Sequence, residues 1–472
     1  MDRSIGNTFN VSKEQNTQEI ERRRFPPYPE YKDSGVEWLG EIPKHWRLMP
    51  LKHICTRSAL YGANEPADTY IEKGVRFLRT TDISDQGDLM EDGVYLSVEA
   101  VSDFLLQTGD LLFSRSGTIG RSFLYDQEKH GPCAYAGYLV RFVPGPEFFP
   151  LFGFYLTKSL HFEHWAATAV ISSTIGNLNA QKYANMPCPK PPLTEQIEIS
   201  RFLDSETAKI DAFIEKKERL IELLQEKRTA LITQAVTKGL DPTVPMTDSG
   251  VEWLGDIPKH WEARRLKFVL SAPLKYGANE AAELEEPDLP RYVRITDIDE
   301  NDGLRDETFK SLPDEVAKEY LLREGDILFA RSGATAGKTF LYRKSWGTCA
   351  YAGYLIRARL DNEKASPEFI RYFTASIGYW QWLASVFIQA TIQNVSAERY
   401  ASLSLPLPPL SEQRTIAAFL DSKAAKIYTL ILRIREAITY LRDYRTALIS
   451  AAVTGKIDVR EACVLTEILI KG

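Results

Sequence analysis

Residues 194–237 read TEQIEISRFLDSETAKIDAFIEKKERLIELLQEKRTALITQAVT, and this stretch decides the fold. It runs for 44 residues without a glycine or a proline. Thr194 can cap the start of a helix, and Gly239 can end it in a left-handed turn. An uninterrupted helix of that length spans about 66 Å, which is longer than an ordinary globular domain is wide. The sequence therefore predicts one long helix that needs a partner to cover its apolar seam.

Residues 411–454 supply the partner, because they repeat the first stretch 217 residues later: PPLTEQ becomes PPLSEQ, FLDS is kept, and RTALITQAVT becomes RTALISAAVT. In both stretches apolar side chains fall on the a and d positions of one heptad frame. In the first stretch they are Ile199, Leu203, Ile210, Phe213, Leu220, Leu224 and Leu231. In the second they are Ile416, Leu420, Ile427, Leu430, Ile434, Ala437, Leu441, Tyr444, Leu448 and Ala451. We expect the two helices to pair with each other.

The rest of the chain is repeated as well. DSGVEWLGEIPKHW at 33–46 returns at 248–261 with only Glu41 replaced by Asp256. YGANE, R-x-TDI, GDLLFSRSG and CAYAGYLVR in the first half are followed by YGANE, R-x-TDI, GDILFARSG and CAYAGYLIR in the second. The chain is thus one unit used twice, a globular domain and a long helix each time, which predicts a pseudo-twofold molecule.

Each globular unit is expected to mix helices and strands, so the fold class is α+β. β-branched and aromatic runs predict strands at 74–78, 110–113 and 137–142, and apolar spacing predicts a helix over 150–169. Prolines between 187 and 192 predict a stiff connector into the long helix. The predicted order is a disordered arm at 1–30, a domain at 31–190, a helix at 191–240, a domain at 241–407, a helix at 408–458 and a tail at 459–472.

Composition limits the class of protein. The chain has 472 residues, is 44% hydrophobic and 26% charged, and contains no apolar run of membrane-spanning length. Its five cysteines are scattered without a CxxC pair, and its six histidines form no metal-spaced cluster. We therefore expect a soluble protein of the reducing cytoplasm without membrane, disulfide framework or metal site. A net charge of −6 says little about the charge of any one face.

Motifs for catalysis are missing. GATAGKT at 333–339 has three residues between its glycines, whereas a phosphate-binding Walker A loop needs four. Phe25-Pro26-Pro27-Tyr28 resembles an amino-methyltransferase loop, but Phe25 stands where that motif wants Asn, Asp or Ser. No glycine-rich cofactor loop or repeated Ser-His-Asp order accompanies it. We expect a chain that is not an enzyme and binds no cofactor.

The repeated loops suit nucleic acid instead. Hydroxyls, guanidinium groups and backbone N–H groups of the RSG loops can contact phosphates, and arginine can also grip guanine. Asparagine can read adenine, and tyrosine can stack or meet a thymine methyl group. The candidate DNA-binding residues are Tyr61, Asn64, Arg79, Thr81, Ser114, Arg115, Ser116, Arg121, Tyr135, Asn177, Tyr276, Asn279, Arg294, Thr296, Arg331, Ser332, Lys338, Tyr351 and Asn394.

Structural roles compete with that interpretation. The GD-[LI]-LF-x-RSG segment can be a hairpin turn whose arginine pairs with a nearby aspartate. Asp82 and Asp297 are expected to cap turns. The four tryptophans of the DSGVEWLG-x-IPKHW motif are expected to be core anchors: Trp38, Trp46, Trp253 and Trp261.

The ordered combination of these motifs strongly resembles the specificity subunit of type I restriction-modification systems. It comprises DSGVEWLG-x-IPKHW, GD-[LI]-LF-x-RSG, an N-[LV]-x-A turn at 177–180 and 394–397, and PPL-[TS]-EQ before a long helix. The resemblance covers nearly all of residues 31–458. It departs from the pattern in the polar stretch before Tyr31, which is longer than such a domain needs.

The resemblance implies two target-recognition domains separated by two long helices that pair antiparallel as a coiled coil and set the spacing. Each domain would read one half of a bipartite, asymmetric site in double-stranded DNA. The subunit itself would be non-catalytic. Two methylation subunits would dock on it and methylate adenine, and restriction subunits would add ATP-dependent cleavage. Two other hypotheses remain: a DNA-modifying enzyme with fused recognition domains, and a coiled-coil interaction scaffold that never touches DNA and keeps Arg115 and Arg331 facing inward.

Overall fold

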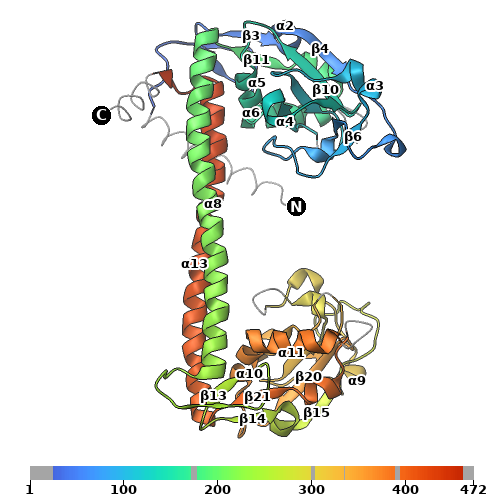
Figure 1. Ribbon diagram of the computed structural model, residues 1–472, viewed down its shortest axis with the longest axis vertical. Coiled ribbons are helices and arrows are strands. Elements are labelled where there is room, and N and C mark those ends of the chain that lie inside the picture. Colours follow the sequence, from blue (N-terminus) through green and yellow to red (C-terminus); the bar gives the residue numbers. More distant parts are fainter. Residues whose placement is uncertain are drawn as a thin grey trace. The chain divides into compact units, whose positions relative to one another are not determined.

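A computed structural model gives the structure of the protein and describes residues 25–117, 119–171, 178–298, 303–333, 335–388 and 394–460. The chain divides into two compact units, each with its own part of the two long helices. Unit 1 consists of Met1–Lys217 and Glu436–Gly472, and unit 2 consists of Glu218–Arg435. Figure 1 colours the chain along its sequence and labels the elements of both units.

Unit 1 contains an antiparallel four-stranded sheet in the order β4-β10-β7-β8 and a three-stranded sheet in the order β6-β5-β9. The first sheet comprises β4 (Cys55–Tyr61), β10 (Leu139–Pro144), β7 (Leu111–Ser114) and β8 (Ser122–Leu124). The second comprises β6 (Val94–Leu96), β5 (Val75–Leu78) and β9 (Cys133–Tyr135). Two pairs complete the strands: β1 (Tyr31–Asp33) with β2 (Glu41–Pro43), and β3 (Arg47–Pro50) with β11 (Pro187–Lys190).

The helices of unit 1 show one break that the sequence did not predict. The expected helix over 150–169 is two helices, α5 (Pro150–Leu156) and α6 (Leu160–Ile171). Ser159 lies between them with its hydroxyl bonded to the Leu156 carbonyl and its Oγ accepting from the Phe162 N–H, so it starts the second helix anew. The shorter helices are α2 (Leu51–Ile54), α3 (Val98–Val101), α4 (Gln127–His130) and α7 (Ala180–Ala184).

Unit 2 repeats this plan, as the duplicated sequence requires. Its four-stranded sheet has the order β15-β20-β17-β18, formed by β15 (Leu270–Tyr276), β20 (Leu355–Leu360), β17 (Ile327–Ala330) and β18 (Thr339–Leu341). The two-stranded sheets pair β16 (Arg291–Val293) with β19 (Cys349–Tyr351), β14 (Glu262–Arg265) with β21 (Ser404–Leu407), and β12 (Met246–Asp248) with β13 (Asp256–Pro258). Its helices are α9 (Asp314–Ala317), α10 (Pro367–Phe373), α11 (Ile377–Ile388) and α12 (Ala397–Ala401).

Two long helices are present as predicted: α8 (Leu193–Lys238) and α13 (Leu410–Val453). In unit 1 they are joined by an ion pair in which Arg445 Nε lies 3.0 Å from Asp211 Oδ1. In unit 2 Ile232 and Ala235 of α8 share one apolar cluster with Ile416 and Leu420 of α13. The N-terminal part of each helix thus accompanies the C-terminal part of the other, which is antiparallel pairing.

The predicted seam is correct at most of its positions. The buried residues are Ile199, Leu203, Ile210, Ile416, Leu420, Ile434, Leu448 and Ala451, and the partly buried ones are Leu224, Leu231, Ile427, Ala437, Leu441 and Tyr444. The prediction is wrong at Phe213, Leu220 and Leu430, which are 58%, 43% and 44% exposed. In each case the residue that follows in the sequence is covered instead: Ile214 and Ile431 are buried, and Ile221 is partly buried. Ile438, which follows Ala437, is buried as well. Spacings of three and of four residues both keep side chains on one face of a helix. At each of these positions the predicted residue and the residue after it are both apolar, so either could be covered.

The PPL-[TS]-EQ motif joins each domain to its long helix. Gln196 is fully buried, and its Oε1 accepts from the Phe149 N–H at 2.8 Å while its Nε2 donates to the carbonyls of Pro191 and Glu147. Gln413 repeats these bonds with Ser366, Pro408 and Lys364 in unit 2. The strand β11 leads into this junction, so Pro187 and Pro189 of the predicted connector belong to a strand pair, and Pro191 and Pro192 link that strand to α8.

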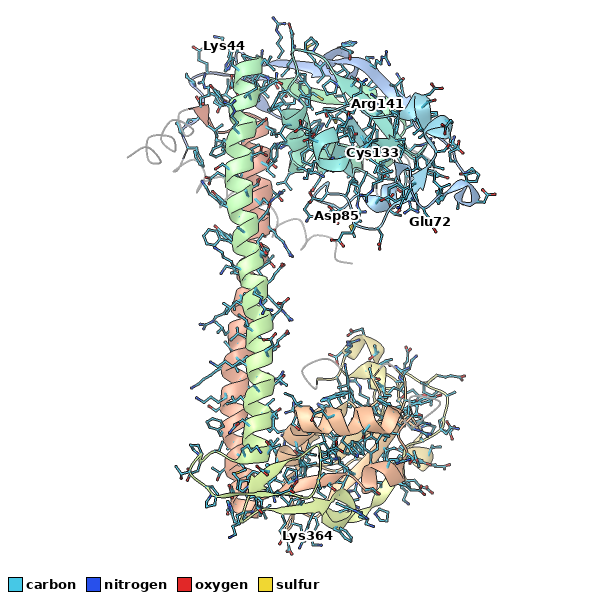
Figure 2. The ribbon with its side chains drawn as sticks, viewed as in Figure 1. Lys44, Glu72, Asp85, Cys133, Arg141 and Lys364 are labelled. Atoms are coloured by element: carbon cyan, nitrogen blue, oxygen red, sulfur yellow. The ribbon has the colours of Figure 1, made fainter. Side chains whose placement is uncertain are left out.

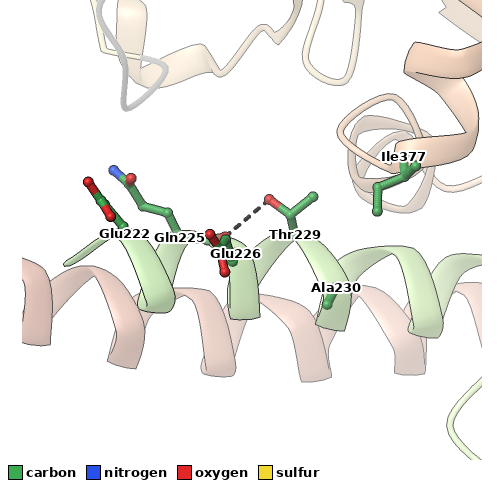
Figure 3. Close-up of a pocket in the computed structure, with 6 residues that line it drawn as sticks. All are labelled: Glu222, Gln225, Glu226, Thr229, Ala230 and Ile377. Atoms are coloured by element: carbon green, nitrogen blue, oxygen red, sulfur yellow. Dashed lines mark hydrogen bonds between the residues drawn. The ribbon is translucent and has the colours of Figure 1, made fainter. Parts of the chain in front are cut away.

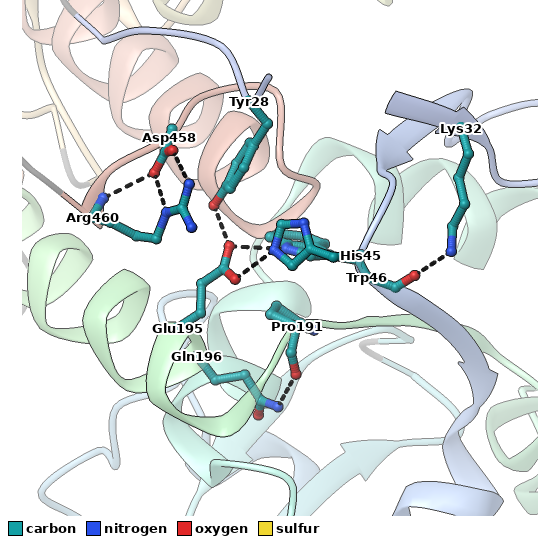
Figure 4. A network of polar contacts seen from close by, with 9 residues as sticks. All are labelled: Tyr28, Lys32, His45, Trp46, Pro191, Glu195, Gln196, Asp458 and Arg460. Carbon is teal, nitrogen blue, oxygen red and sulfur yellow. Dashed lines mark hydrogen bonds and ion pairs between the residues drawn. The ribbon is translucent and has the colours of Figure 1, made fainter. Parts of the chain in front are cut away.

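Residues 25–30 belong to the folded unit, so the predicted disordered arm is wrong for them; residues 1–24 lie outside the described residues. Phe25 and Tyr28 are buried. The Glu195 carboxylate accepts from Tyr28 Oη at 2.5 Å and from Trp46 Nε1 at 2.9 Å, and it contacts His45 Nε2 at 2.8 Å (Figure 4). Burial and this carboxylate raise the pKa of Tyr28 far above its usual range. The segment that resembled a methyltransferase loop is therefore part of a structural network.

Residues 455–460 pack against the same segment. The Asp458 N–H donates to the Pro26 carbonyl at 2.7 Å, and Tyr31 Oη donates to the Gly455 carbonyl at 3.0 Å. Val459 is buried and Arg460 lies over the ring of Tyr28 at 5.0 Å, so the predicted tail is wrong for these two residues; residues 461–472 lie outside the described residues. Trp46 and Trp261 are core anchors as predicted, whereas Trp38 and Trp253 are only partly buried.

Candidate nucleic-acid interface

The backbones of the YGAN and YAGY motifs lie against each other in each domain. The Ala63 N–H donates to the Tyr135 carbonyl at 2.9 Å, and the Ala278 N–H donates to the Tyr351 carbonyl at 2.8 Å. A Cβ atom on Gly62 would lie 2.2 Å from the Tyr135 carbonyl oxygen, and one on Gly277 would lie 2.3 Å from the Ala352 oxygen. Glycine is required there because two backbones touch, which explains why both copies keep it.

An arginine lies on a tyrosine ring at this contact. Arg115 follows β7, and its guanidinium carbon lies 5.0 Å from the ring centre of Tyr61. Arg331 follows β17 and lies 4.8 Å from the ring centre of Tyr276. The tyrosine hydroxyls are held in turn, since they accept from the N–H groups of Ala180 and Ala397 at 3.2 and 3.0 Å. Stacking on a fixed ring orients a guanidinium without using its N–H groups.

Among the described residues, no aspartate pairs with Arg115 or Arg331, although the competing interpretation required such a pair. Both are partly exposed. In unit 2 Arg331 Nε donates to Asn394 Oδ1 at 3.3 Å. In unit 1 Arg115 Nε is buried and has no hydrogen-bond partner among the described residues, and the matching Asn177 lies outside them. The hairpin itself is present, because β7 pairs antiparallel with β8 on either side of the loop.

Several other predicted DNA-binding side chains are accessible. Asn64, Asn279 and Asn394 are exposed, and so are Thr81, Thr296 and Lys338. Ser116 and Ser332 are partly exposed beside the stacked arginines. Amides and hydroxyls of this kind can bond base edges or phosphates. Of these groups, Asn394 contacts the stacked arginine of its own domain directly.

Three predicted contacts are wrong because the side chains are buried. Tyr135 and Tyr351 lie in β9 and β19, whose residues are buried on both faces. Tyr351 Oη donates to the Lys275 carbonyl, and burial raises the pKa of this tyrosine to about 12. Ser114 is also buried, with its hydroxyl bonded to the Ser116 carbonyl. These residues shape the interface but cannot reach a ligand.

The R-x-TDI arginines have a structural role. Arg79 donates from its guanidinium to both Asp82 oxygens at 3.0 and 2.7 Å, and Arg294 does the same with Asp297. Asp82 and Asp297 also accept the N–H groups of Arg79 and Arg294, so the prediction that they cap turns is confirmed. Two of the guanidinium nitrogens of each arginine are thus engaged within the domain, while both side chains remain partly exposed, and their contact with DNA stays a prediction.

Arg121 and Lys338 differ although they occupy matching loops. Arg121 Nε lies 2.6 Å from Asp85 Oδ1, and its NH1 donates to the Ile83 carbonyl. Lys338 is exposed. At this position the second domain exposes the ammonium group of Lys338, whereas the guanidinium of Arg121 in the first domain is bound to Asp85 and Ile83. This is one chemical difference between the two candidate interfaces.

A buried ion pair supports the strand before each RSG loop. In unit 1 Arg141, which is labelled in Figure 2, has its Nη2 atom 2.6 Å from Asp110 Oδ2. Burial raises the pKa of the Asp110 carboxyl group. In unit 2 Asp326 keeps the role but pairs with Arg359 at 2.6 Å. The aspartate of the GD motif also accepts the N–H of the residue three positions earlier, so it fixes the turn that enters β7 or β17.

Tyr138 and Tyr354 were not predicted as site residues, but the structure places their backbones beside those of the two arginines. They are 62% and 66% exposed. The carbonyls of Tyr138 and Tyr354 accept from the N–H groups of Arg115 and Arg331, both at 3.0 Å. The one available signal was the second tyrosine of CAYAGY, which follows a glycine and so stands in a turn.

A depression on α8 has a different character. It has a volume of about 540 Å³ and is lined by Glu222, Gln225, Glu226, Thr229 and Ala230 of α8 with Ile377 of α11 (Figure 3). Two carboxylates make it unsuited to phosphate. Within the described residues no group of histidine, cysteine or acidic side chains could hold a metal ion. No helix in the same part of the chain is long and apolar enough to cross a membrane.

The chain contains two similar domains in tandem, and each is followed by a long helix. Each domain carries a stacked arginine and exposed amides, and this arrangement defines a class of duplicated recognition protein. The model of the family described as type I restriction modification DNA specificity domain matches residues 43–223 and again residues 258–440. These matches cover more than half of the chain, which therefore belongs to this family.

Relatives and solved structures agree with that assignment. The chain is 22% identical over 440 residues to the type I restriction enzyme EcoKI specificity subunit of Escherichia coli K12, covering 89% of this chain and 91% of the relative. It is 21% identical to the StySPI specificity subunit of Salmonella potsdam with the same coverage. A chain in a solved type I R-M system covers 88% of this chain and 99% of its own length, with a TM-score of 0.63 at 20% identity. The HsdS subunit from Thermoanaerobacter tengcongensis covers 88% and 98%, with a TM-score of 0.51 at 16% identity. At these identities the solved structures support the fold alone.

Proposed function

We propose that the chain is the non-catalytic DNA-recognition subunit of a type I restriction-modification complex. Each domain reads one half of a bipartite site in double-stranded DNA. The observation that carries this proposal is the arginine stacked on tyrosine, Arg115 on Tyr61 and Arg331 on Tyr276, built twice at equivalent places. The interaction-scaffold alternative requires these arginines to face inward, and their partial exposure does not favour it.

The chemistry of the cluster fits DNA reading. A guanidinium held flat on a ring presents its N–H groups in a fixed direction, which suits two hydrogen bonds to guanine O6 and N7. The exposed amides of Asn64 and Asn279 suit adenine. Lys338 and the RSG hydroxyls suit phosphates, which position the protein without reading sequence.

The two long helices serve as spacer and docking platform in this proposal. Their pairing holds the two recognition domains on one scaffold, and Phe213, Leu220, Leu430 and Tyr440 expose apolar surface on it. Two methylation subunits that methylate adenine would dock around the helices, and restriction subunits would join through the complex. The relatives are named as specificity subunits of type I restriction enzymes, which supports such partners. A cytoplasmic location follows from this role.

Mapping methylated adenines in the genome of cells that express the chain with its partner subunits tests the proposal. We expect a bipartite, asymmetric motif with a fixed spacer. We also expect the half-sites, read on opposite strands, to share at least one base, because YGANE, the RSG loop and CAYAG are common to both domains. The domains differ mainly in residues 84–108 against 299–324 and in 147–173 against 361–390, so the other bases should differ. A continuous motif would contradict the proposal, and half-sites without a common base would contradict the shared-contact argument.

A further inference from the structure

Tyr138 and Tyr354 are the most exposed large apolar side chains in the described parts of the chain, at 62% and 66%. A single exposed tyrosine on a protein surface needs no explanation. These two, however, occupy the same position of both domains, each directly opposite the stacked arginine of its own domain. The repetition of an exposed ring at one defined place indicates a ligand that covers it.

The backbone that carries each ring is fixed. The Leu139 N–H closes a turn onto the Ala136 carbonyl at 2.9 Å, and the Leu355 N–H closes the same turn onto Ala352 at 2.8 Å. A Cβ atom on Gly137 would lie 2.1 Å from Asn64 Oδ1, so the turn packs against that amide group. The ring thus stands on a rigid turn, and rigid aromatic groups lose little conformational entropy on binding.

The neighbours of the ring favour nucleic acid over an apolar protein face. The Tyr138 carbonyl accepts from the N–H of Arg115, whose guanidinium lies on the Tyr61 ring, and the exposed amide of Asn64 packs against Gly137, the residue before Tyr138. A protein-docking site would surround an exposed aromatic ring with further apolar side chains. Cationic and amide groups around a bare ring are instead the combination with which proteins grip the backbone of nucleic acid and stack on its bases.

We propose that Tyr138 and Tyr354 each lay the aromatic ring against a base in the half-site that its own domain reads. This inference rests on the proposed function and adds to it a contact of a different kind. Because the bases of a duplex are stacked on one another, the ring reaches a base face by opening one base step, as wedge side chains do. Such a contact accepts every base, so it contributes affinity and fixes the register in which the arginine and asparagine read their base edges. The hydroxyl group is not needed for it.

The test uses the chain assembled with its methylation subunits and a duplex carrying the mapped target. Tyr138→Ala and Tyr354→Ala should each weaken binding about 5- to 100-fold, because the stacking surface is lost. Tyr138→Phe and Tyr354→Phe keep the ring and should stay within about twofold of the unsubstituted complex. Phe268→Ala is the matched control, because Phe268 is also an exposed aromatic side chain but precedes β15 at the end opposite Tyr276.

Fluorescent 2-aminopurine placed in turn at each position of the target locates the contact. The unsubstituted complex should change the fluorescence at one position in each half-site, and Tyr138→Ala should abolish only the change in the half-site of the first domain. Failure of the unsubstituted complex to bind would overturn the proposed function itself. Normal binding by both alanine variants would overturn the ring contact alone. Three other outcomes would overturn it too. Equal losses in the phenylalanine and alanine variants would indicate a contact of the hydroxyl group. An affinity loss without any 2-aminopurine change would indicate a contact with the DNA backbone, and a loss of subunit assembly would indicate a contact with protein.

Discussion

Inserting one heptad into α8 after Leu220 and one into α13 after Ala437 is expected to lengthen the spacer between the half-sites by about three base pairs. Seven helical residues add about 10 Å, and B-DNA rises about 34–36 Å per 10–10.5 base pairs. A whole heptad keeps the pairing frame, because covered residues such as Ile214 and Ile221 recur seven positions apart. The half-site sequences should not change. Adenine methylation mapping reads the spacer and both half-sites together.

A heptad inserted into only one helix is the matched control. It lengthens one seam without the other, so stable folding should be lost, which circular dichroism and thermal melting would detect. Methylation at the original spacing by a folded chain with both insertions would mean that the helices do not set the distance between the half-sites.

Arg115→Ala is expected to weaken binding by about 1–3 kcal/mol and to relax one base position in the half-site of the first domain. Arg331→Ala should do the same for the second domain. The reason is the stacking on Tyr61 and Tyr276, which gives each guanidinium a defined orientation toward a base edge. Binding to targets substituted one base pair at a time, at several salt concentrations, measures both effects.

Arg115→Lys separates base reading from phosphate attraction. Lysine keeps the charge but cannot make the planar pair of hydrogen bonds, so the relaxed position should persist. Arg264→Ala is the control, because Arg264 is an exposed arginine of β14 that pairs with Glu262. If Arg115→Ala weakened all sequences equally and reduced the salt dependence, the arginine would contact only phosphate. Unchanged affinity, specificity and salt dependence would show that it is scaffold.

The duplication and the long helices could be predicted because their signals extend over many residues. A glycine- and proline-free stretch with apolar spacing leaves little alternative to a helix, and the repeated motifs define two domains. The covered face of that helix was missed only in the middle, where Phe213 stands beside Ile214 and Leu220 beside Ile221. Choosing between such neighbours requires the partner helix. The role of Tyr28 was missed for the same reason, because Glu195 and Trp46 are distant in sequence.

The candidate site was predicted in part. The RSG arginines and Asn64 could be chosen because their residue types suit DNA and they stand in turns. Tyr135 was chosen in place of Tyr138 because alternation along a strand says which side chains share a face but not whether both faces are covered. The residues of β9 are all buried, and the exposed tyrosine comes only after the Gly137 turn. The structural role of Arg79 was not predicted, although its partner Asp82 stands only three residues away.

Replacing residues 248–407 with a copy of residues 33–190 tests the central claim most directly, because it leaves the helices in place and gives both positions the same recognition domain. The motifs at both junctions are shared, so the exchange keeps the local sequence at each end. Adenine methylation mapped in cells that express this chain with its partner subunits should report the first half-site twice, once on each strand, with the second half-site gone. Methylation of the original asymmetric target by the exchanged chain would contradict the account.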